Sequence, residues 1–486
     1  MPKTVVIGGG IGGSACAGLL AKEGHEVHLL ERNAFLGGKC SAYIRDGFHS
    51  DWGVHGFSRG GAGPLVKIAN AVGGRLEFIS PDPISLVMDH FHGRTRRYPY
   101  PLHIRKFLNQ ARMGVHMGVK PWNYLGGMRL FQTLGRFDWG VIREWGTQTV
   151  KELISHFTDD EQTHRFMNMF CLLMFAQPYD EASAGEYIYV FSTMIAKAQG
   201  GYPRGGCQAI TDAFLKNFES RGGRIHLRRP VKKIVTDGEA VKGVETDEGF
   251  MEADVVISNA GIKNTLRMAG QENFPEEYWS RIHHLKDSYG VVTIKYALKQ
   301  RVLDFPILLY VPDTTGRAMF DFLEREDGAP ADPMIFMPVV TNFDPNLGPP
   351  GSQMAIAATI CTARPGVNVT KLAEVLDNRV KDLFPEIAKN LLWQHVTTQD
   401  DIKRITGRAN GECIGLAQTT DQVGQNRPSP RLPVRGLYCA GADTGGRGVG
   451  TEMAAESALI TVEMVKNDLK GLAPEATPIA IQPIAT

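Results

Sequence analysis

A glycine-rich turn near the N-terminus is the feature that most restricts the fold of this chain. An apolar stretch at 4–7 leads into Gly8-Gly9-Gly10-Ile11-Gly12-Gly13, an apolar helical pattern follows to Lys22, and a second apolar stretch, 26–30, ends on Glu31. Strand, Gly-x-Gly-x-x-Gly, helix, strand and acid in this order are typical of a dinucleotide-binding βαβ unit. The sequence therefore predicts an α/β domain whose first turn and helix start hold a dinucleotide.

Each glycine of this turn has a mechanical task. Gly8 makes the tight turn, Gly10 lets the backbone approach a pyrophosphate, and Gly13 lets the helix pack closely on the strand. The helix that begins here offers free N–H groups and a partial positive charge to the phosphates. Glu31, eighteen residues after Gly13, is placed to accept hydrogen bonds from an adenosine ribose.

A second pair of glycines follows the acid, in the run Arg32-Asn33-Ala34-Phe35-Leu36-Gly37-Gly38-Lys39. Here the chain resembles the FAD-containing amine-oxidase and phytoene-desaturase superfamily, whose first βαβ unit is followed by a Gly-Gly-Arg/Lys turn. Two adjacent glycines let the backbone run flat against the cofactor, and a cation there can face its phosphates. The resemblance favours FAD over NAD and implies cofactor contacts at Arg32, Gly37, Gly38 and Lys39.

Glycine is also concentrated near the C-terminus, where five of the residues 441–450 are glycines. An apolar stretch, 437–440, leads into a Gly-rich loop that opens a helix, and members of the superfamily carry a similar strand, loop and helix there. The resemblance implies that Asp443 bonds the ribityl chain and that the helix start faces the flavin pyrimidine ring, where a helix N-terminus stabilises negative charge. The residues expected at this contact are Gly441, Val449, Gly450, Thr451 and Met453.

Segments between the two ends extend the resemblance over roughly residues 3–466. The run 47–55 resembles the family strand and Gly-x-His turn beside the isoalloxazine, which implies contacts at Gly53, Val54 and His55. Tyr202-Pro203-Arg204-Gly205-Gly206 looks like a phytoene-desaturase segment, so we favour the phytoene-desaturase and carotenoid-oxidoreductase branch. The resemblance further implies that the backbone of Val231 contacts adenine. The strand 254–260 returns to the nucleotide sheet and carries the last expected contacts, Asn259 and Ala260.

The pattern predicts an α/β fold: a Rossmann-type FAD-binding domain built from discontinuous segments, and an α+β substrate domain of mixed sheet plus helices. We expect residues 1–65, 200–262 and 405–468 in the FAD-binding domain, and 66–93 with 263–404 in the substrate-domain sheet. We expect 94–199 to form a helical subdomain that faces the substrate or a membrane, and 469–486 to be a flexible tail.

The segment 94–151 is strongly basic in a chain whose formal charge is only +1. It holds eleven Lys/Arg against two acidic residues, a net charge of +9, and three of the six tryptophans. Ile104, Phe107, Leu108, Ala111 and Val115 share one helical face beside basic residues, the pattern of a helix that lies in a membrane interface. The alternative is a helix that packs on its own domain with a solvated basic face. No nucleic-acid module accompanies the charge, so we do not expect nucleic-acid binding.

The cysteine content and the apolar runs of the sequence indicate the cellular compartment and whether a metal site is expected. The seven cysteines are scattered without a Cys-x-x-Cys pair, which argues against a disulfide framework and a zinc site, so we expect no metal and a reducing compartment. No secretory signal pattern opens the chain, and no apolar run reaches the length of a membrane span. We therefore expect a cytoplasmic protein, free or peripheral on the cytoplasmic membrane face. The oligomeric state is left open.

Four residues are candidates for acid–base work. The resemblance implies that His55 lies beside the flavin. Glu452 stands at the start of the final helix, where carotenoid desaturases more often have small or apolar residues, and Glu412 and Arg447 are the other two candidates. For each, a structural role is the competing interpretation. The final loop reads Gly445-Gly446-Arg447 and lacks the His-Pro-Gly pattern common in carotenoid desaturases, so the carotenoid substrate is less constrained than the cofactor.

The main hypothesis is an FAD-dependent oxidoreductase that acts on carbon–carbon bonds of an isoprenoid, carotenoid-like or other lipophilic substrate, with hydride transfer at flavin N5. Desaturation, isomerisation and saturation all fit it, and the electron acceptor is left open. Two alternatives stay open: an amine-oxidase-type flavoprotein acting on C–N bonds, and a flavin-binding escort protein without turnover.

Overall fold

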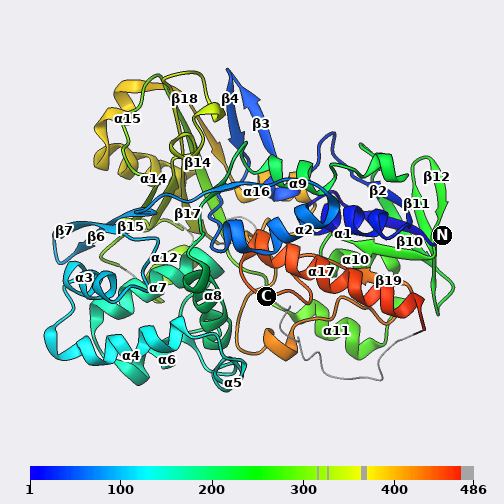
Figure 1. Ribbon diagram of the computed structural model, residues 1–486, viewed down its shortest axis with the longest axis horizontal. Helices are drawn as coiled ribbons and strands as arrows, with labels where there is room; N and C mark the ends of the chain where they lie inside the picture. The colour runs from blue at the N-terminus through cyan, green and yellow to red at the C-terminus, as the bar shows by residue number, and fades with distance from the viewer. Residues whose placement is uncertain (315–316, 326–327, 363–368, 472–486) are drawn as a thin grey trace.

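The computed structural model describes residues 1–314, 317–325, 328–362 and 369–471, which build two large sheets with helices on both sides of each (Figure 1). The first sheet is five-stranded and parallel, in the order β19-β13-β1-β2-β9. Its strands are β1 (Lys3–Ile7), β2 (Glu26–Leu30), β9 (Arg224–His226), β13 (Val255–Ser258) and β19 (Leu437–Cys439). Because these strands come from distant parts of the sequence, the nucleotide-binding domain is discontinuous, and the α/β prediction is confirmed.

Both faces of the parallel sheet are covered, which is why its strands are continuous apolar runs. On one face, Val6 and Leu29 belong to the core that α1 (Ile11–Lys22), α2 (Pro64–Val72), α9 (Gln208–Phe214) and α17 (Gly450–Leu469) share. On the other face, Val5 and Ile7 pack with α10 (Ile262–Ala269) and with the antiparallel sheet β10-β11-β12. The strands of that sheet are β10 (Val231–Thr236), β11 (Val241–Thr246) and β12 (Gly249–Glu252).

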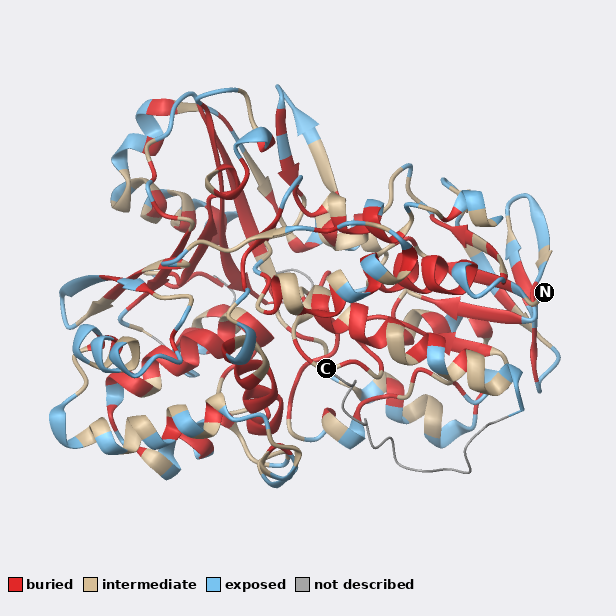
Figure 2. Ribbon diagram, in the orientation of Figure 1, coloured by how far each residue is buried: buried red, intermediate tan, exposed pale blue. Residues whose placement is uncertain are grey.

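The second sheet is mixed and seven-stranded, in the order β18-β14-β17-β16-β15-β6-β7. Its strands are β6 (Ser85–Phe91), β7 (Arg94–Tyr100), β14 (Gly290–Leu298), β15 (Ile307–Val311), β16 (Ile335–Pro338), β17 (Gln353–Cys361) and β18 (Leu391–Thr397). One face packs against α14 (Val369–Leu383) and α15 (Pro385–Asn390), and the other packs against α7 (Glu161–Phe175) and α8 (Ala184–Lys197). The inner strands β14 to β17 are almost entirely buried, whereas the edge strand β7 is largely exposed (Figure 2).

The expected helical subdomain begins later than predicted. Residues 94–100 form strand β7, which pairs with β6 through a hairpin at His92 and Gly93. Both turn residues have positive φ, 48° and 72°, as a tight hairpin turn requires. The prediction of helix for 94–100 is therefore wrong. These residues are extended because they pair with β6, and a charged, mostly exposed edge strand has no apolar alternation that identifies it as a strand. The helices that follow are α3 (Phe107–Met117), α4 (Tyr124–Gly135), α5 (Trp139–Glu144) and α6 (Val150–Phe157).

Two domain boundaries also differ from those expected. α2 lies in 66–93, assigned to the substrate domain, yet it packs on α1, α9 and α17 of the nucleotide-binding domain. α10 and α11 (Glu276–His284) lie in 263–404 but share the core of the parallel sheet through Leu266 and Ile282. Local apolar patterns identify a helix but not the sheet that it covers. Of the expected tail, 472–486 lie outside the described residues, and residue 469 still belongs to α17.

The remaining short elements connect the domains. The hairpin of β3 (Ala42–Arg45) and β4 (Phe48–Asp51) and the pair β5 (Phe78–Ile79) and β8 (Tyr202–Pro203) join the nucleotide-binding segments. The helices α12 (Arg317–Glu324), α13 (Val340–Phe343) and α16 (Gln399–Thr406) flank the seven-stranded sheet. Among the described residues, no helix has both the length and the apolar character needed to cross a bilayer.

Candidate functional site

A continuous cavity of about 720 Å³ joins the two sheets. At one end, which we call the cofactor end, its wall is made of the glycine-rich segments predicted from the sequence. The predicted contacts found in this wall are Gly8, Gly10, Ile11, Gly12, Glu31, Arg32, Gly37, Gly38, Lys39, Gly53, Val54, His55, Val231, Asn259, Ala260, Val449, Gly450 and Thr451. Segments as distant as residues 8 and 451 thus meet around one space.

The geometry of the first turn explains its glycines. Gly8 has a φ of 90°, in the left-handed region, and its backbone turns directly toward α1. A Cβ on Gly13 would lie 2.0 Å from the carbonyl oxygen of Gly8, so only glycine permits this contact of helix and strand. A Cβ on Gly10 would lie 2.6 Å from Oδ1 of Asn259, and no side chain caps α1. The helix start is therefore free to bind a phosphate group.

The acid at the end of β2 is held in place by the chain itself. Oε2 of Glu31 accepts a hydrogen bond of 2.8 Å from the Gly9 N–H, and Oε1 accepts one of 2.8 Å from the Asn33 N–H. These bonds fix the buried carboxylate at the cavity wall, in the position expected for a ribose contact.

The charge of the cofactor end suits a dianionic diphosphate. Six cationic side chains reach the cavity there: Arg32, Lys39, Arg229, Lys232, Arg267 and Arg408. Within the described part of the chain, the only carboxylates in the cavity wall are those of Glu31 and Glu452. Glycines that would clash if they carried a Cβ, a free helix start and an excess of cations together fit FAD.

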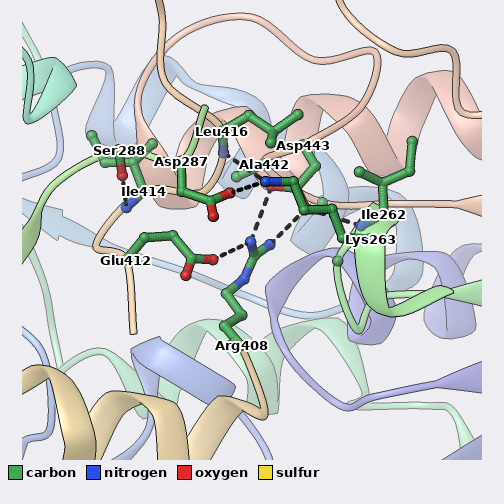
Figure 3. A network of polar contacts seen from close by, with 12 residues as sticks. Ile262, Lys263, Asp287, Ser288, Arg408, Glu412, Ile414, Leu416, Ala442 and Asp443 are labelled. Carbon is green, nitrogen blue, oxygen red and sulfur yellow. Dashed lines mark hydrogen bonds and ion pairs between the residues drawn. The ribbon is translucent and has the colours of Figure 1, made fainter. Parts of the chain in front are cut away.

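Asp443 is not part of the cavity wall, whereas the half-buried Arg408, to which it is bonded (Figure 3), is. Arg408 donates hydrogen bonds of 3.1 Å to both carboxylate oxygens of Asp443, which also accept the N–H groups of Ile262 and Leu416. Although burial acts to raise it, the Arg408 guanidinium and the backbone N–H hold the pKa of Asp443 below its usual value. In this structure Arg408 lines the cavity and Asp443 orients Arg408, while the ribityl contact expected of Asp443 stays a prediction.

Three other predicted cofactor residues also lie behind the wall. Gly13 packs on Gly8, Met453 is fully buried beneath the start of α17, and Gly441 packs beside the Asn259 amide. In this structure they bring elements close together, and the cofactor contacts expected of them stay predictions. Sequence reasoning missed Arg408, and the only local signal for it is the acid four residues later, Glu412.

Glu412 and Lys39 belong to the same cluster. The Glu412 carboxylate bonds Arg408 at 2.5 Å and lies outside the cavity wall, which leaves it no access to a substrate. Nζ of Lys39 donates to the backbone carbonyls of Glu412 and Cys413, at 2.6 and 2.9 Å. Burial, helped by the charge of Arg408, lowers the pKa of Lys39 to about 8. Lys39 is therefore a cavity cation that titrates near neutral pH.

Glu452 lies in the cavity wall, but both of its oxygens are occupied. Oε1 accepts the N–H groups of Arg59 and Gly60 at 2.8 and 3.0 Å, and Oε2 accepts the Ser58 hydroxyl at 2.7 Å. The Arg59 guanidinium lies 3.5 Å from the same carboxylate and 2.8 Å from that of Glu456. This arrangement ties the start of α17 to the turn 58–60 and opposes the expected acid–base role.

Arg447 also has a structural setting. It lies outside the cavity wall, 3.4 Å from the Glu186 carboxylate, with its guanidinium over the rings of Trp139 and Tyr189 at 5.1 and 5.7 Å. It therefore connects the final loop to α5 and α8, and the geometry gives it no contact with a substrate.

His55 lines the cavity, with Nε2 3.0 Å from the backbone oxygen of Lys39 and its ring stacked on Phe57. Burial lowers the pKa of His55, so the neutral imidazole is favoured at neutral pH. Although spacing in the sequence predicted no metal, the fold brings the side chains of Cys40, His55 and Cys207 within 4.8 Å of one another. Burial raises the pKa of Cys207, which favours a thiol over a metal-binding thiolate.

Beyond the cofactor end the cavity becomes apolar, and we call this part the chamber. One wall is the seven-stranded sheet and the other is α7 and α8, to which the Met- and Phe-rich stretch 170–174 of α7 contributes. The chamber is lined by Ser85, Tyr100, Leu102, Ile104, Phe170, Leu172, Leu173, Met174, Met194, Ile195, Val291, Thr293, Ile307, Leu309, Met334, Phe336, Ala358, Thr359 and Ile360.

Comparisons with known proteins agree with this geometry. The family model of flavin-containing amine oxidoreductases matches residues 11–465. A ζ-carotene-forming phytoene desaturase of Myxococcus xanthus is 25% identical, over 91% of this chain and 90% of its own length. A chloroplastic prolycopene isomerase of Daucus carota is 24% identical, over 96% of this chain and 80% of its own.

Solved structures show the same fold. An oxidoreductase of Methanosarcina mazei superposes with a TM-score of 0.74 at 23% identity, over 95% of this chain and 100% of that one. A putrescine oxidase bound to putrescine superposes with a TM-score of 0.64 at 13% identity, over 96% of this chain and 99% of that one.

Proposed function

The chain belongs to the flavin-containing amine oxidoreductase family and is an FAD-dependent oxidoreductase, and from this premise we propose that it acts on carbon–carbon bonds of an elongated isoprenoid or similar lipophilic substrate. The observation that carries this proposal is the chamber: a mostly apolar space that opens directly onto the cofactor end. Such a wall gains free energy by burying a hydrocarbon and excludes water from the reacting atoms.

The residues of the cofactor end have distinct tasks in this proposal. The backbone at Gly10, Gly37 and Gly38 accommodates the diphosphate, and Arg32 and Arg408 balance its charge. Bound FAD would supply the redox chemistry by accepting or returning a hydride at flavin N5. No side chain caps the start of α17, so this helix N-terminus at Val449–Thr451 can stabilise negative charge on the cofactor.

The same chamber argues against a C–N substrate. A protonated amine that leaves water is costly to bury unless it is paired, most directly with a carboxylate. Among the described residues of the chamber none is acidic, and Glu452, at its border, already bonds the turn 58–60 and Arg59. An aliphatic wall built of Ile307, Leu309 and Ile360 instead suits a hydrocarbon chain.

We also propose that α3 and α4 rest on a membrane surface, where a lipophilic substrate would be found. The exposed fractions are 64% for Phe107, 66% for Leu108, 67% for Val115, 75% for Trp122 and 61% for Leu125. Exposed cations surround them, namely Arg105, Lys106, Arg112, Lys120 and Arg129. These helices lie at the end of the molecule opposite the N-terminus (Figure 1). Apolar side chains among cations are what an interfacial helix needs.

The chamber supports this surface as an entrance. Its wall includes Leu102 and Ile104, only a few residues before the exposed Phe107. Ile104, which the sequence placed on the exposed helical face, is instead buried and precedes α3. Binding to vesicles that contain anionic lipid at low salt tests the proposal. The double variant Phe107→Ser, Leu108→Ser should bind weakly, and wild-type protein that stays unbound would refute it.

The main experiment separates an enzyme from an escort protein. The purified holoprotein is mixed with an acyclic isoprenoid hydrocarbon under anaerobic conditions, and the flavin absorbance near 450 nm is followed. For an oxidative enzyme we expect bleaching with formation of a new double bond in the hydrocarbon. If several acyclic isoprenoids bind but neither bleach oxidised flavin nor are altered by reduced flavin, the enzyme proposal fails and the escort alternative stands.

A further inference from the structure

Two hydroxyl groups lie opposite each other at the end of the chamber that is farthest from the cofactor. Ser85 is the first residue of β6 and Tyr100 is the last residue of β7, and the two are direct cross-strand partners. Because partners of this kind point to the same face of a sheet, both side chains lie on the face that carries Val87 and Tyr98. That face packs on α7 and α8, and both Ser85 and Tyr100 are part of the chamber wall.

Neither hydroxyl is engaged by the part of the chain that the structure describes. Ser85 is 5% exposed and Tyr100 is 6% exposed, and no other described residue forms a hydrogen bond with either hydroxyl. The ring of Tyr100 is held between Phe170 and Phe166, with centroids 5.6 and 6.2 Å away. A buried hydroxyl among apolar groups is unfavourable unless it finds a partner. The site thus presents two fixed, unpaired donors to whatever fills the chamber.

The distance between the two hydroxyls and the cofactor side of the chamber indicates how an elongated substrate would be oriented. Strand β14, whose Val291 and Thr293 line the chamber on the cofactor side, is separated from β7 by five inter-strand steps. Strand β6, which carries Ser85, is four steps from β14, so at about 4.8 Å a step the two hydroxyls lie roughly 19–24 Å from β14 across the sheet. The wall between them is built from apolar side chains of β15, β16 and β17, such as Leu309, Phe336 and Ile360.

We propose that Ser85 and Tyr100 bind an oxygen-bearing end, a hydroxyl or carbonyl group, of the elongated substrate. The inference rests on the proposed function, since it takes the occupant of the chamber to be a lipophilic chain. An apolar chain with one oxygenated end would satisfy both donors while its body fills the apolar wall. Discrimination follows, because a hydrocarbon without the oxygen leaves two buried hydroxyls unpaired. Ser85 and Tyr100 are thus specificity-determining residues, remote from the reacting atoms.

The test compares geranylgeraniol with the same hydrocarbon chain lacking the hydroxyl. Dissociation constants for both are measured on the FAD-loaded protein by the change in flavin fluorescence. We expect the wild type to bind the alcohol at least tenfold more tightly, and Tyr100→Phe or Ser85→Ala to reduce this preference by about tenfold. The matched control is Tyr98→Phe, which removes a buried, unpaired hydroxyl two residues earlier on the same face but outside the chamber wall. The control should keep the wild-type preference.

The outcomes separate the two proposals. Equal affinity of the wild type for both compounds, or a preference that both variants retain, overturns the assignment of Ser85 and Tyr100 while the lipophilic substrate class stands. If neither compound binds the holoprotein, the lipophilic substrate class itself fails, and the hydroxyl pair loses its ligand with it. Loss of preference in the variants but not in the Tyr98→Phe control supports the assignment.

Discussion

A buried lysine on the second strand of the seven-stranded sheet makes the stability of this protein depend on pH. Lys295 lies on β14 and is 0% exposed. Its Nζ donates to the backbone oxygen of Trp52 at 2.8 Å, to the Thr293 hydroxyl at 2.7 Å and to the Thr397 hydroxyl. All three acceptors are uncharged, so hydrogen bonds compensate the desolvated ammonium only in part. Burial therefore lowers the pKa of Lys295 to about 7.

The magnitude follows from the difference between folded and unfolded states. An unfolded lysine titrates near pH 10.4, so the folded state disfavours the proton by roughly 3.4 pKa units, or about 4–5 kcal/mol at 1.36 kcal/mol a unit. Between pH 7 and about 10.4 the unfolded chain binds more protons than the folded protein, so stability rises with pH in this window. Below pH 7 both states are protonated and the full penalty applies.

The assay is urea unfolding of wild type and Lys295→Met at several pH values from 7.5 to 9.5. Methionine does not titrate and fills a similar volume, so the constant effect of the lost hydrogen bonds cancels in the comparison. We expect the free energy of unfolding of the wild type to gain about 2–3 kcal/mol on the variant across this range. Lys299→Met removes an exposed amine just beyond the same strand and serves as the control. A wild-type-minus-variant difference that stays flat with pH would refute the reasoning.

Three further predictions concern the cofactor end. A bound anionic cofactor favours protonated Lys39, whose pKa is about 8. The dissociation constant of FAD should therefore rise above pH 8 by up to about tenfold per pH unit. Fluorescence titration should find that the dissociation constant of Lys39→Met does not show this rise with pH. Glu452→Gln removes the charge that holds Arg59 and the turn 58–60, so urea unfolding should show a loss of about 2–3 kcal/mol while FAD-loaded protein keeps turnover within a few-fold. Full FAD content with turnover lost more than a hundredfold would instead make Glu452 catalytic. Gly13→Ala places a Cβ 2.0 Å from a backbone oxygen and should lower stability by about 1–3 kcal/mol and deplete FAD. Gly127→Ala on α4 is the control, because a Cβ added there meets no atom within 4 Å beyond its own helix backbone. It should leave the FAD content unchanged and leave the stability unchanged or raise it by up to about 1 kcal/mol.

The nucleotide-binding half of the site could be predicted from the sequence because its contacts are local. The turn of Gly8 to Gly13 and the acid Glu31 lie within one βαβ unit, where residue order and spacing fix the geometry. Apolar stretches covered on both faces likewise identified the strands of the parallel sheet. Periodicity was misleading at the charged edge strand 94–100, whose conformation is set by pairing with β6, and at Ile104, which precedes α3 and is buried.

The roles of single polar residues were decided by the tertiary structure. Glu452 had the position of a catalytic acid, yet the N–H of Arg59, 393 positions away, occupies it. Asp443 had the position of a cofactor ligand, yet it bonds Arg408, which lines the cavity. The spacing of residues in the sequence does not show which distant hydrogen-bond donor will lie next to a given carboxylate in the folded protein. A buried charged side chain pairs with the donors or acceptors that the fold places beside it, because burying the charge unpaired costs more free energy.

The sequence by itself therefore determined the cofactor, the fold class and the order of the segments that build the FAD site. Only the tertiary structure decided how the apolar chamber runs across the mixed sheet, that Ile104 faces it while Phe107 faces outward, and that Ser85 meets Tyr100 at its far end. The physical reason is the range of the interactions. A phosphate-binding turn is specified by backbone conformation over a few residues, whereas a cavity is the space left between side chains that packing brings together from the whole chain.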